Sequence, residues 1–216
     1  MGLRICLRST HARAHQEGLT FPNSFVRKLS ENYKSGSKQR GRRPMEDRAF
    51  RRVLGEFATG VAVVTARGQG EELIGMTMSS FNSVSLDPPL VLFSVDRKAK
   101  SLPAMLEARG FAVNILAREQ EQISNQFARA LSNKWDQVKT SVGHAEAPLI
   151  SGALAHFECA PFASYDGGDH VIFVVRVVRH SARSEPATPL IFFRGRYRDL
   201  VDETEREPTW PLPIHY

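Results

Sequence analysis

The sequence has few of the features that mark membrane or disulfide-rich proteins. Its 216 residues include only two cysteines, Cys6 and Cys159, too few for a disulfide framework. The longest apolar stretches, such as residues 171–175, are far too short to cross a bilayer. We therefore expect no membrane segment and a reducing compartment, the cytoplasm. Cys159 stands beside apolar residues and is expected to be a small core side chain.

The signatures of several site classes are also absent from the sequence. No Gly-x-Gly-x-x-Gly follows a predicted strand and no Gly-x-x-x-x-Gly-Lys-Ser loop occurs, so neither nucleotide-binding motif is predicted. His156 and Cys159 are close in sequence, but no CxxC or HxxxH pair accompanies them. Metal sites in proteins need more ligands than these two, so none is expected.

Positive charge is concentrated at the N-terminus. The net charge is +6, but residues 1–44 carry ten Lys and Arg against two Glu, whereas residues 45–216 have a net charge of −2. The body is therefore not expected to bind nucleic acid on charge grounds. Residues 1–44 lack a sustained period and are expected to be a weakly ordered basic extension. They fit a targeting peptide, a basic arm, or extra coding sequence before a start at Met45. We favour the last, because Met45 directly precedes the first clear helix.

Three helices are predicted within a single domain of residues 45–200. The first spans residues 47–58, with Asp47 as its N-cap and Gly60 as its stop. The others span residues 101–108 and 119–131. The apolar residues of the first helix recur at helical spacing and form one stripe: Phe50, Val53, Leu54 and Phe57.

Strands account for most of the remaining domain. A turn at residues 68–70 joins the first two predicted strands into a hairpin. Many short strands with few helices favour a small barrel over alternating βαβ units. Residues 201–216 are expected to form a tail over the surface or a partner subunit. The predicted strands cover residues 61–66, 73–81, 90–95, 111–116, 153–164, 171–178 and 190–193.

Two polar segments offer the hydrogen-bonding groups that a flat ring with a phosphate tail needs. In residues 75–81, Thr77 and Ser79 are expected on one face of a strand, and Met76, Met78 and Ser80 on the other. In residues 96–101 a strand ends and a helix begins. The free N–H groups of a helix start, with Ser101 as N-cap and Lys100 beside it, attract phosphate. An ordinary polar strand edge and a capped helix with solvated lysines explain the same residues.

A third segment, residues 166–170, places His170 at a strand start. The two glycines, Gly167 and Gly168, permit a tight turn, and Asp169 puts an acid beside the histidine. By itself this segment reads as a plain hairpin turn.

An ordered set of motifs resembles the short-chain flavin reductases. These motifs are Phe57-Ala58-Thr59-Gly60-Val61, Gly75-Met76-Thr77-x-Ser79-Ser80-Phe81, the run of residues 83–91, Gly168-Asp169-His170, and Pro189 through Tyr197. The similarity covers residues 47–200 in the expected order. It implies a mainly β split barrel with peripheral helices, and a homodimer with flavin near the subunit interface. It also implies hydride transfer from NADH or NADPH to FMN or FAD, with reduced flavin supplied to a partner flavin-dependent monooxygenase.

The resemblance also implies roles for particular residues. His170 would lie beside the nicotinamide as the catalytic position, with Gly168 and Asp169 before it. Lys100 and Ser101 would hold the flavin phosphate. Phe111 and Asn114 match a strand motif, and Asn114 can be structural. The isoalloxazine and ribityl chain would be bordered by Met76, Thr77, Met78, Ser79 and Ser80, with Ser94, Val95 and Asp96 lining the same pocket.

Two other functions fit parts of the sequence. A split barrel can bind flavin or haem without turning over a diffusible flavin, but such a protein would need no nicotinamide site. The segment Gly168-Asp169-His170 therefore favours the enzyme. Alternatively, the basic residues 1–44 would be the functional element, an arm for nucleic acid or membrane, whose binding would depend on salt.

Overall fold

The computed structural model describes residues 44–129 and 133–200. The predicted N-terminal extension, apart from Pro44, and the predicted tail of residues 201–216 lie outside these ranges. Among the described helices, none is long and apolar enough to cross a membrane. The α-helices are α2 Pro44–Leu54, α3 Leu102–Glu107 and α4 Glu121–Phe127, and the short 3₁₀ helices are Gln69–Glu71, Arg118–Gln120 and His144–Glu146.

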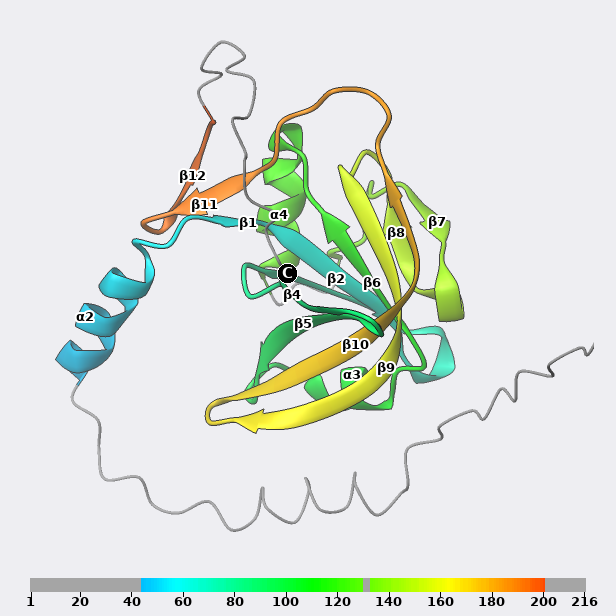
Figure 1. The fold of residues 1–216 in the computed structure, drawn as a ribbon, viewed down its shortest axis with the longest axis horizontal. Helices are drawn as coiled ribbons and strands as arrows, with labels where there is room; N and C mark the ends of the chain where they lie inside the picture. The colour runs from blue at the N-terminus through cyan, green and yellow to red at the C-terminus, as the bar shows by residue number, and fades with distance from the viewer. Residues whose placement is uncertain (1–43, 130–132, 201–216) are drawn as a thin grey trace, which may run out of the picture. The chain divides into compact units, whose positions relative to one another are not determined.

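Strands dominate the described chain, as predicted (Figure 1). A seven-stranded antiparallel sheet has the order β3-β2-β6-β9-β10-β5-β4, and two small sheets join β1-β11-β12 and β7-β8. The strands are β1 Thr59–Gly60, β2 Ala62–Arg67, β3 Leu73–Met78, β4 Asn82–Leu86, β5 Pro89–Asp96, β6 Phe111–Ile115, β7 Thr140–Val142, β8 Pro148–Ile150, β9 Ala155–Gly167, β10 His170–Ala182, β11 Ile191–Phe193 and β12 Arg196–Arg198.

The larger of two core clusters lies inside the curved large sheet and includes Leu102 and Met105 of α3. Phe93, Phe111 and Phe173, from β5, β6 and β10, are at most 4% exposed and pack as an aromatic cluster. The rings of Phe93 and Phe173 stack with centroids 5.2 Å apart, and Phe111 meets both edge-on. Cys159 is fully buried beside them, as expected, and this burial raises the pKa of its thiol to about 12. Aromatic burial of this kind is among the largest stabilising contributions to a fold.

The first helix departs from its prediction at both ends. It begins at Pro44, so Asp47 lies within the helix and is not its N-cap. Proline suits a first helical turn because its missing N–H would have no intrahelical partner there. The helix ends at Leu54, and Gly60, predicted as its stop, instead belongs to β1. The chain from Gly55 to Phe57 continues in single turns that bond back three or four residues.

The other differences concern short elements. The helix predicted for residues 119–131 is a 3₁₀ turn followed by α4, which ends at Phe127. The strand predicted for residues 73–81 ends at Met78, and a separate strand, β4, follows. The strands β1, β4, β7, β8 and β12 were not predicted, because runs of two to five residues with little alternation leave no periodic signal.

Candidate active site

A cleft of about 490 Å³ lies where the end of β3, the end of β5 and the start of β10 meet. Antiparallel pairing of β5 with β10 sets His170 opposite Asp96 and Ile172 opposite Ser94, which brings segments far apart in sequence to one place. The cleft therefore collects most of the residues that the sequence predicted as a group. It is lined by Met76, Thr77, Met78, Ser79, Ser80, Ser94, Asp96, Gly167, His170 and Ile172.

Alternation along β3 distributes its side chains as predicted. The Thr77 hydroxyl donates to the Ser124 carbonyl oxygen of α4 at 2.7 Å. Met78 points to the opposite side and is 8% exposed in the core, with Met76 packed against the same cluster. The strand therefore meets α4 on one face and the barrel core on the other.

A segment after α4 braces the outer edge of β3. Because β3 is an edge strand of the large sheet, alternate carbonyl groups have no neighbouring strand. The Trp135 indole N–H donates to the Leu73 carbonyl and the Lys134 ammonium to the Gly75 carbonyl, each at 3.0 Å. Partial burial lowers the pKa of Lys134. The edge of the strand that lines the cleft is thus held by two side chains.

Gly75 is required by close packing against this brace. A Cβ placed at Gly75 would stand 2.4 Å from the Phe127 ring and 3.1 Å from Trp135. Phe127 is 1% exposed and meets Trp135 edge-on at a centroid distance of 4.7 Å. Any larger residue at position 75 of the sequence motif would therefore clash with the Phe127 ring.

The Ser80 side chain links the loop after β3 to the backbone of β5 beside the cleft. Its hydroxyl oxygen accepts from the Ser94 N–H at 3.0 Å and lies 3.3 Å from the Ser94 carbonyl oxygen, to which it donates. A single hydroxyl thus satisfies both backbone groups of Ser94 where β4 has not yet begun. This fixes the loop after β3 against β5.

A tight turn joins β9 to β10 and presents His170. Gly168 has φ +78°, a left-handed conformation that glycine adopts without strain. Asp166 Oδ1 accepts from the Gly168 N–H at 2.9 Å. His170 Nδ1 lies 2.8 Å from Asp169 Oδ1, which leaves the other ring nitrogen for the cleft.

Nothing in the sequence assigns a role to Arg97, whose side chain bonds this turn. Its Nε donates to the Gly168 carbonyl at 2.8 Å, and its Nη2 lies 2.8 Å from Asp166 Oδ1. The Gly168 N–H and the Arg97 guanidinium hold the pKa of Asp166 below its usual range. Arginine beside a strand end is too common in sequences to single out, and the partner turn lies about 70 positions along the chain.

Several predicted site residues do not line the cleft. The side chain of Val95 is fully buried in the core, so only its backbone could border a ligand. Gly168 and Asp169 are exposed in the turn. Lys100 is exposed and Ser101 half-buried, on the segment that leads from β5 into α3. Ser101 occupies the N-cap position as predicted, but its hydroxyl makes no capping hydrogen bond.

Phe111 and Asn114 both have structural positions on β6. Phe111 belongs to the aromatic cluster of the core. Asn114 is fully buried, donates to the Val63 carbonyl at 2.9 Å and accepts from the Ile150 N–H at 2.7 Å. Asn114 thus ties β6 to β2 and β8 and takes no part in the cleft.

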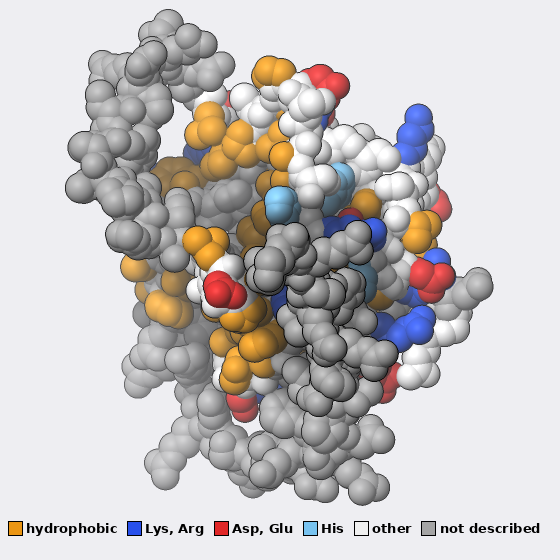
Figure 2. Space-filling model, turned by 45° about the vertical axis from the view of Figure 1, so that its right-hand side comes forward, with side chains coloured by type: hydrophobic (Ala, Val, Ile, Leu, Met, Phe, Trp, Pro, Cys, Tyr) orange, Lys and Arg blue, Asp and Glu red, His pale blue; other side chains and the backbone are white. Residues whose placement is uncertain are grey.

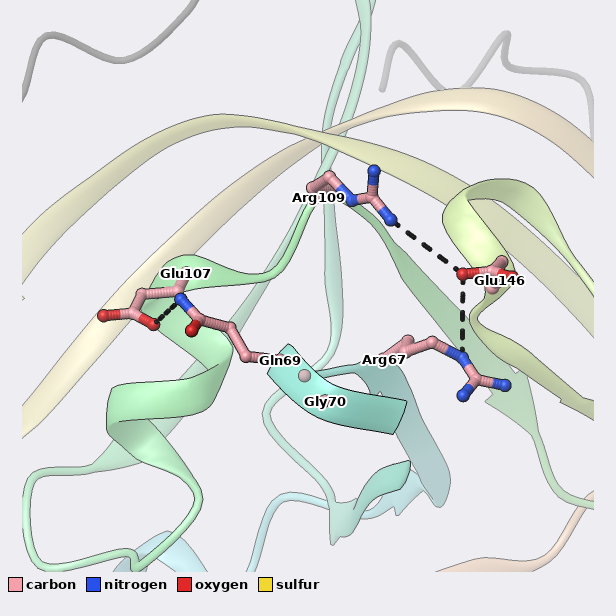
Figure 3. Close-up of a pocket in the computed structure, with 7 residues that line it drawn as sticks. Arg67, Gln69, Gly70, Glu107, Arg109 and Glu146 are labelled. Carbon is pink, nitrogen blue, oxygen red and sulfur yellow. Dashed lines mark hydrogen bonds and ion pairs between the residues drawn. The ribbon is translucent and has the colours of Figure 1, made fainter. Parts of the chain in front are cut away.

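A second cavity, of about 520 Å³, lies at the hairpin between β2 and β3 (Figure 3). Glu146 stands between Arg67 and Arg109, at 3.8 and 3.9 Å, and Gln69 donates to Glu107 at 2.7 Å. The two carboxylates of this cavity therefore already have partners within it. None of the motif residues that form the first cleft lies here, so we assign the candidate active site to the first cleft alone.

Comparison with known proteins agrees with the motifs. The flavin reductase like domain model matches residues 54–201. The chain belongs to the flavin reductase family. It is an NAD(P)H:flavin oxidoreductase, and its fold is the mainly β split barrel expected from the motifs.

Individual relatives within the flavin reductase family are close to this chain. An NADH-dependent FMN reductase of Agrobacterium fabrum is 43% identical over 150 residues, which cover 69% of this chain and 84% of that protein. The reductase component of 4-hydroxyphenylacetate 3-monooxygenase of Thermus thermophilus is 42% identical over 153 residues, 71% of this chain and 96% of the relative. A solved NADH:FAD oxidoreductase of Streptomyces globisporus, in complex with NAD and FAD fragments, superimposes with a TM-score of 0.71 at 38% identity. That match covers 77% of this flavin reductase and 99% of the solved chain.

Proposed function

We propose that this flavin reductase binds FMN or FAD in the cleft between β3, β5 and β10, reduces it with NADH or NADPH, and supplies it to a flavin-dependent monooxygenase. The observation that carries the site assignment is the convergence of Met76 to Ser80, Ser94, Asp96 and His170 on one cleft. The role of monooxygenase partner rests on relatives named as reductase components. We also propose that the enzyme and its partner share one compartment, the cytoplasm, because a diffusible flavin has to pass between them.

The cleft has the size of a small-molecule site and the chemistry that a flavin ring needs. Its volume of about 490 Å³ lies within the roughly 300–1,000 Å³ typical of small-molecule sites. Apolar Met76 and Ile172 can contact ring faces, whereas the backbone and hydroxyls of Ser79 and Ser80 can meet polar ring edges. When bound, the two nucleotides supply the redox chemistry, a hydride passing from nicotinamide C4 to flavin N5 with uptake of one proton.

The residues of the chain position the reactants. His170 stands at the rim of the cleft, where its free ring nitrogen can hydrogen-bond the nicotinamide. Asp169 orients the imidazole through its contact with Nδ1. Because the cofactors carry the hydride, no paired carboxylates are needed. His170 therefore acts by positioning the nicotinamide.

Anaerobic reduction of the flavin tests the function directly. The purified protein is mixed with FMN or FAD and with NADH or NADPH, and the flavin absorbance is followed. At least one of the four pairs is expected to bleach at a rate far above the protein-free mixture. A protein that binds flavin but bleaches it in no pair would instead support the flavin-binding module.

Mutations can test the proposed phosphate site separately from the binding site of the flavin ring. Ser101→Ala is expected to raise the dissociation constant of FMN about tenfold or more, because a hydrogen bond to a charged group contributes roughly 1.5–3 kcal/mol. Lys100→Ala is expected to weaken FMN mainly at low salt, since Lys100 is exposed. Fluorescence titration measures both constants. Riboflavin, which lacks the phosphate, is the control, and an equal loss of riboflavin binding would contradict the assignment.

We also propose that two copies associate through α2. Phe50, Val53, Leu54 and the following Phe57 are 57–75% exposed, so the stripe found in the sequence has no cover within the described chain. The helix stands apart from the large sheet (Figure 1). Other exposed apolar side chains lie on the strands, and Figure 2 shows hydrophobic side chains gathered on one part of the face it views. A second copy of the chain carries the same α2 stripe and the same exposed strand side chains. Each copy can therefore cover the stripe of the other, as a closed dimer requires.

Breaking the stripe is expected to yield monomers. The double substitution Val53→Glu and Phe57→Glu places two charges where a partner would have to desolvate them. Light scattering after size exclusion is expected to show a dimer for the wild type and a monomer for the variant. Arg51→Glu, an exposed charge change on the same helix, is the control and should stay dimeric. A wild type that is monomeric at micromolar concentration would reject the proposed interface.

A further inference from the structure

We propose that Arg97 is the positioning residue for the nicotinamide side of the cleft. It acts by holding the β9–β10 turn and, through that turn, His170. The inference rests on the proposed role of His170 and adds a residue that lies outside the cleft. Arg97 is not among the lining residues, and its side chain is 22% exposed.

Arg97 makes three contacts with residues 166–169, at the turn between β9 and β10. Its backbone N–H donates to the Asp169 carbonyl at 2.9 Å, its Nε donates to the Gly168 carbonyl at 2.8 Å, and its Nη2 pairs with Asp166. The rigid guanidinium fork holds a carbonyl and a carboxylate of the turn together, which a lysine ammonium does less well. The two-residue connection from β9 to β10, Gly168 and Asp169, is therefore tied to the end of β5.

The position of His170 follows from that tie. His170 directly follows the turn, pairs across the sheet with Asp96, and bonds Asp169 through Nδ1. Asp96 is the residue before Arg97, so one short segment both borders the cleft and fixes the turn. Without the Arg97 side chain only the backbone bond to the Asp169 carbonyl remains, so we expect Asp169 and His170 to shift together. The flavin-lining residues of β3 keep their own supports from Ser124, Lys134 and Trp135.

This separation predicts a selective kinetic defect. Arg97→Ala is expected to lower kcat/KM for NADH or NADPH by roughly tenfold to a hundredfold, because a displacement near 1 Å at a reacting group has effects of that size. Its dissociation constant for flavin should stay within about twofold of the wild type. Arg183→Ala is the matched control, since it removes an ion pair of the same 2.8 Å length, with Glu119, from a side chain of 31% exposure.

A double-mutant cycle decides whether Arg97 acts through His170. If it does, Arg97→Ala should change kcat/KM by less than about twofold when His170 is already alanine. Full additivity of the two substitutions would overturn the proposal, as would an equal loss of flavin affinity in Arg97→Ala. Wild-type kinetics in Arg97→Ala with an active wild-type enzyme would also overturn it. By contrast, a wild type inactive with all four cofactor pairs would overturn the proposed function itself.

A milder variant keeps the test valid if Arg97→Ala does not fold. Asp166→Asn retains the oxygen that accepts from the Gly168 N–H but removes the charge that faces Arg97. It is expected to shift kcat/KM for the nicotinamide in the same direction by a smaller factor, with unchanged flavin affinity. No change in kcat/KM for Asp166→Asn, at an unchanged melting temperature, would count against the Arg97 contact as a determinant.

Discussion

Gly75→Ala is expected to destabilise the protein and to weaken its binding of flavin. The added methyl would stand 2.4 Å from the Phe127 ring, which is fully buried and packed against Trp135, so either the ring or β3 must move. Overpacking of this kind costs about 1–3 kcal/mol of the free energy of unfolding. For a domain of this size that corresponds to a fall in melting temperature of roughly 2–12 °C, measurable by calorimetry.

The loss of flavin affinity follows from the place of Gly75 in β3. The next residues of the strand, Met76 and Thr77, line the cleft, so a shift of β3 at Gly75 displaces them. Gly60→Ala is the matched control, because a Cβ at Gly60 meets nothing within 4 Å. A Gly75→Ala protein with the melting temperature and flavin dissociation constant of Gly60→Ala would contradict the steric argument.

His170→Ala is expected to slow reduction of bound flavin by tenfold or more while leaving flavin binding nearly intact. The histidine reaches the cleft from its rim, and general acid or positioning groups contribute about 10²-fold or more to rates when well placed. Stopped-flow mixing of the flavin-loaded variant with NADH or NADPH under anaerobic conditions gives the rate and the apparent affinity for the nicotinamide.

His180→Ala provides the control for this substitution. His180 is exposed and lies on the same strand, β10, at the end remote from the turn. The control should behave as the wild type in both flavin binding and reduction. If His170→Ala reduces flavin at the wild-type rate across nicotinamide concentrations, the role assigned to His170 is wrong and its place in the turn is only structural.

Much of this architecture could be predicted because it depends on local patterns. The hairpin of β2 and β3, the turn at Gly168 and the strand β5 arise from alternation and from glycine, which act over a few residues. The grouping of Met76 to Ser80 with Ser94 and His170 came from an ordered resemblance, and the register of β5 with β10 supplies its physical basis.

The parts that could not be predicted depend on packing between distant segments. Periodicity identified the apolar stripe of α2 but could not show that the stripe lies exposed. The resemblance implied Val95 as a pocket residue together with Ser94 and Asp96, yet strand alternation turns its side chain into the core. The role of Arg97 depends on a turn that only the folded sheet brings near.

The braced edge of β3 also bears on how copies of the protein meet. An open edge strand offers its carbonyl and N–H groups to strands of other molecules and so promotes aggregation. At β3 the carbonyls of Leu73 and Gly75 already accept from Trp135 and Lys134, and a bulky indole lies beside them. These two side chains therefore hinder the pairing of another strand with β3. At its β3 edge, the sheet of the reductase is thereby protected from pairing with strands of neighbouring molecules.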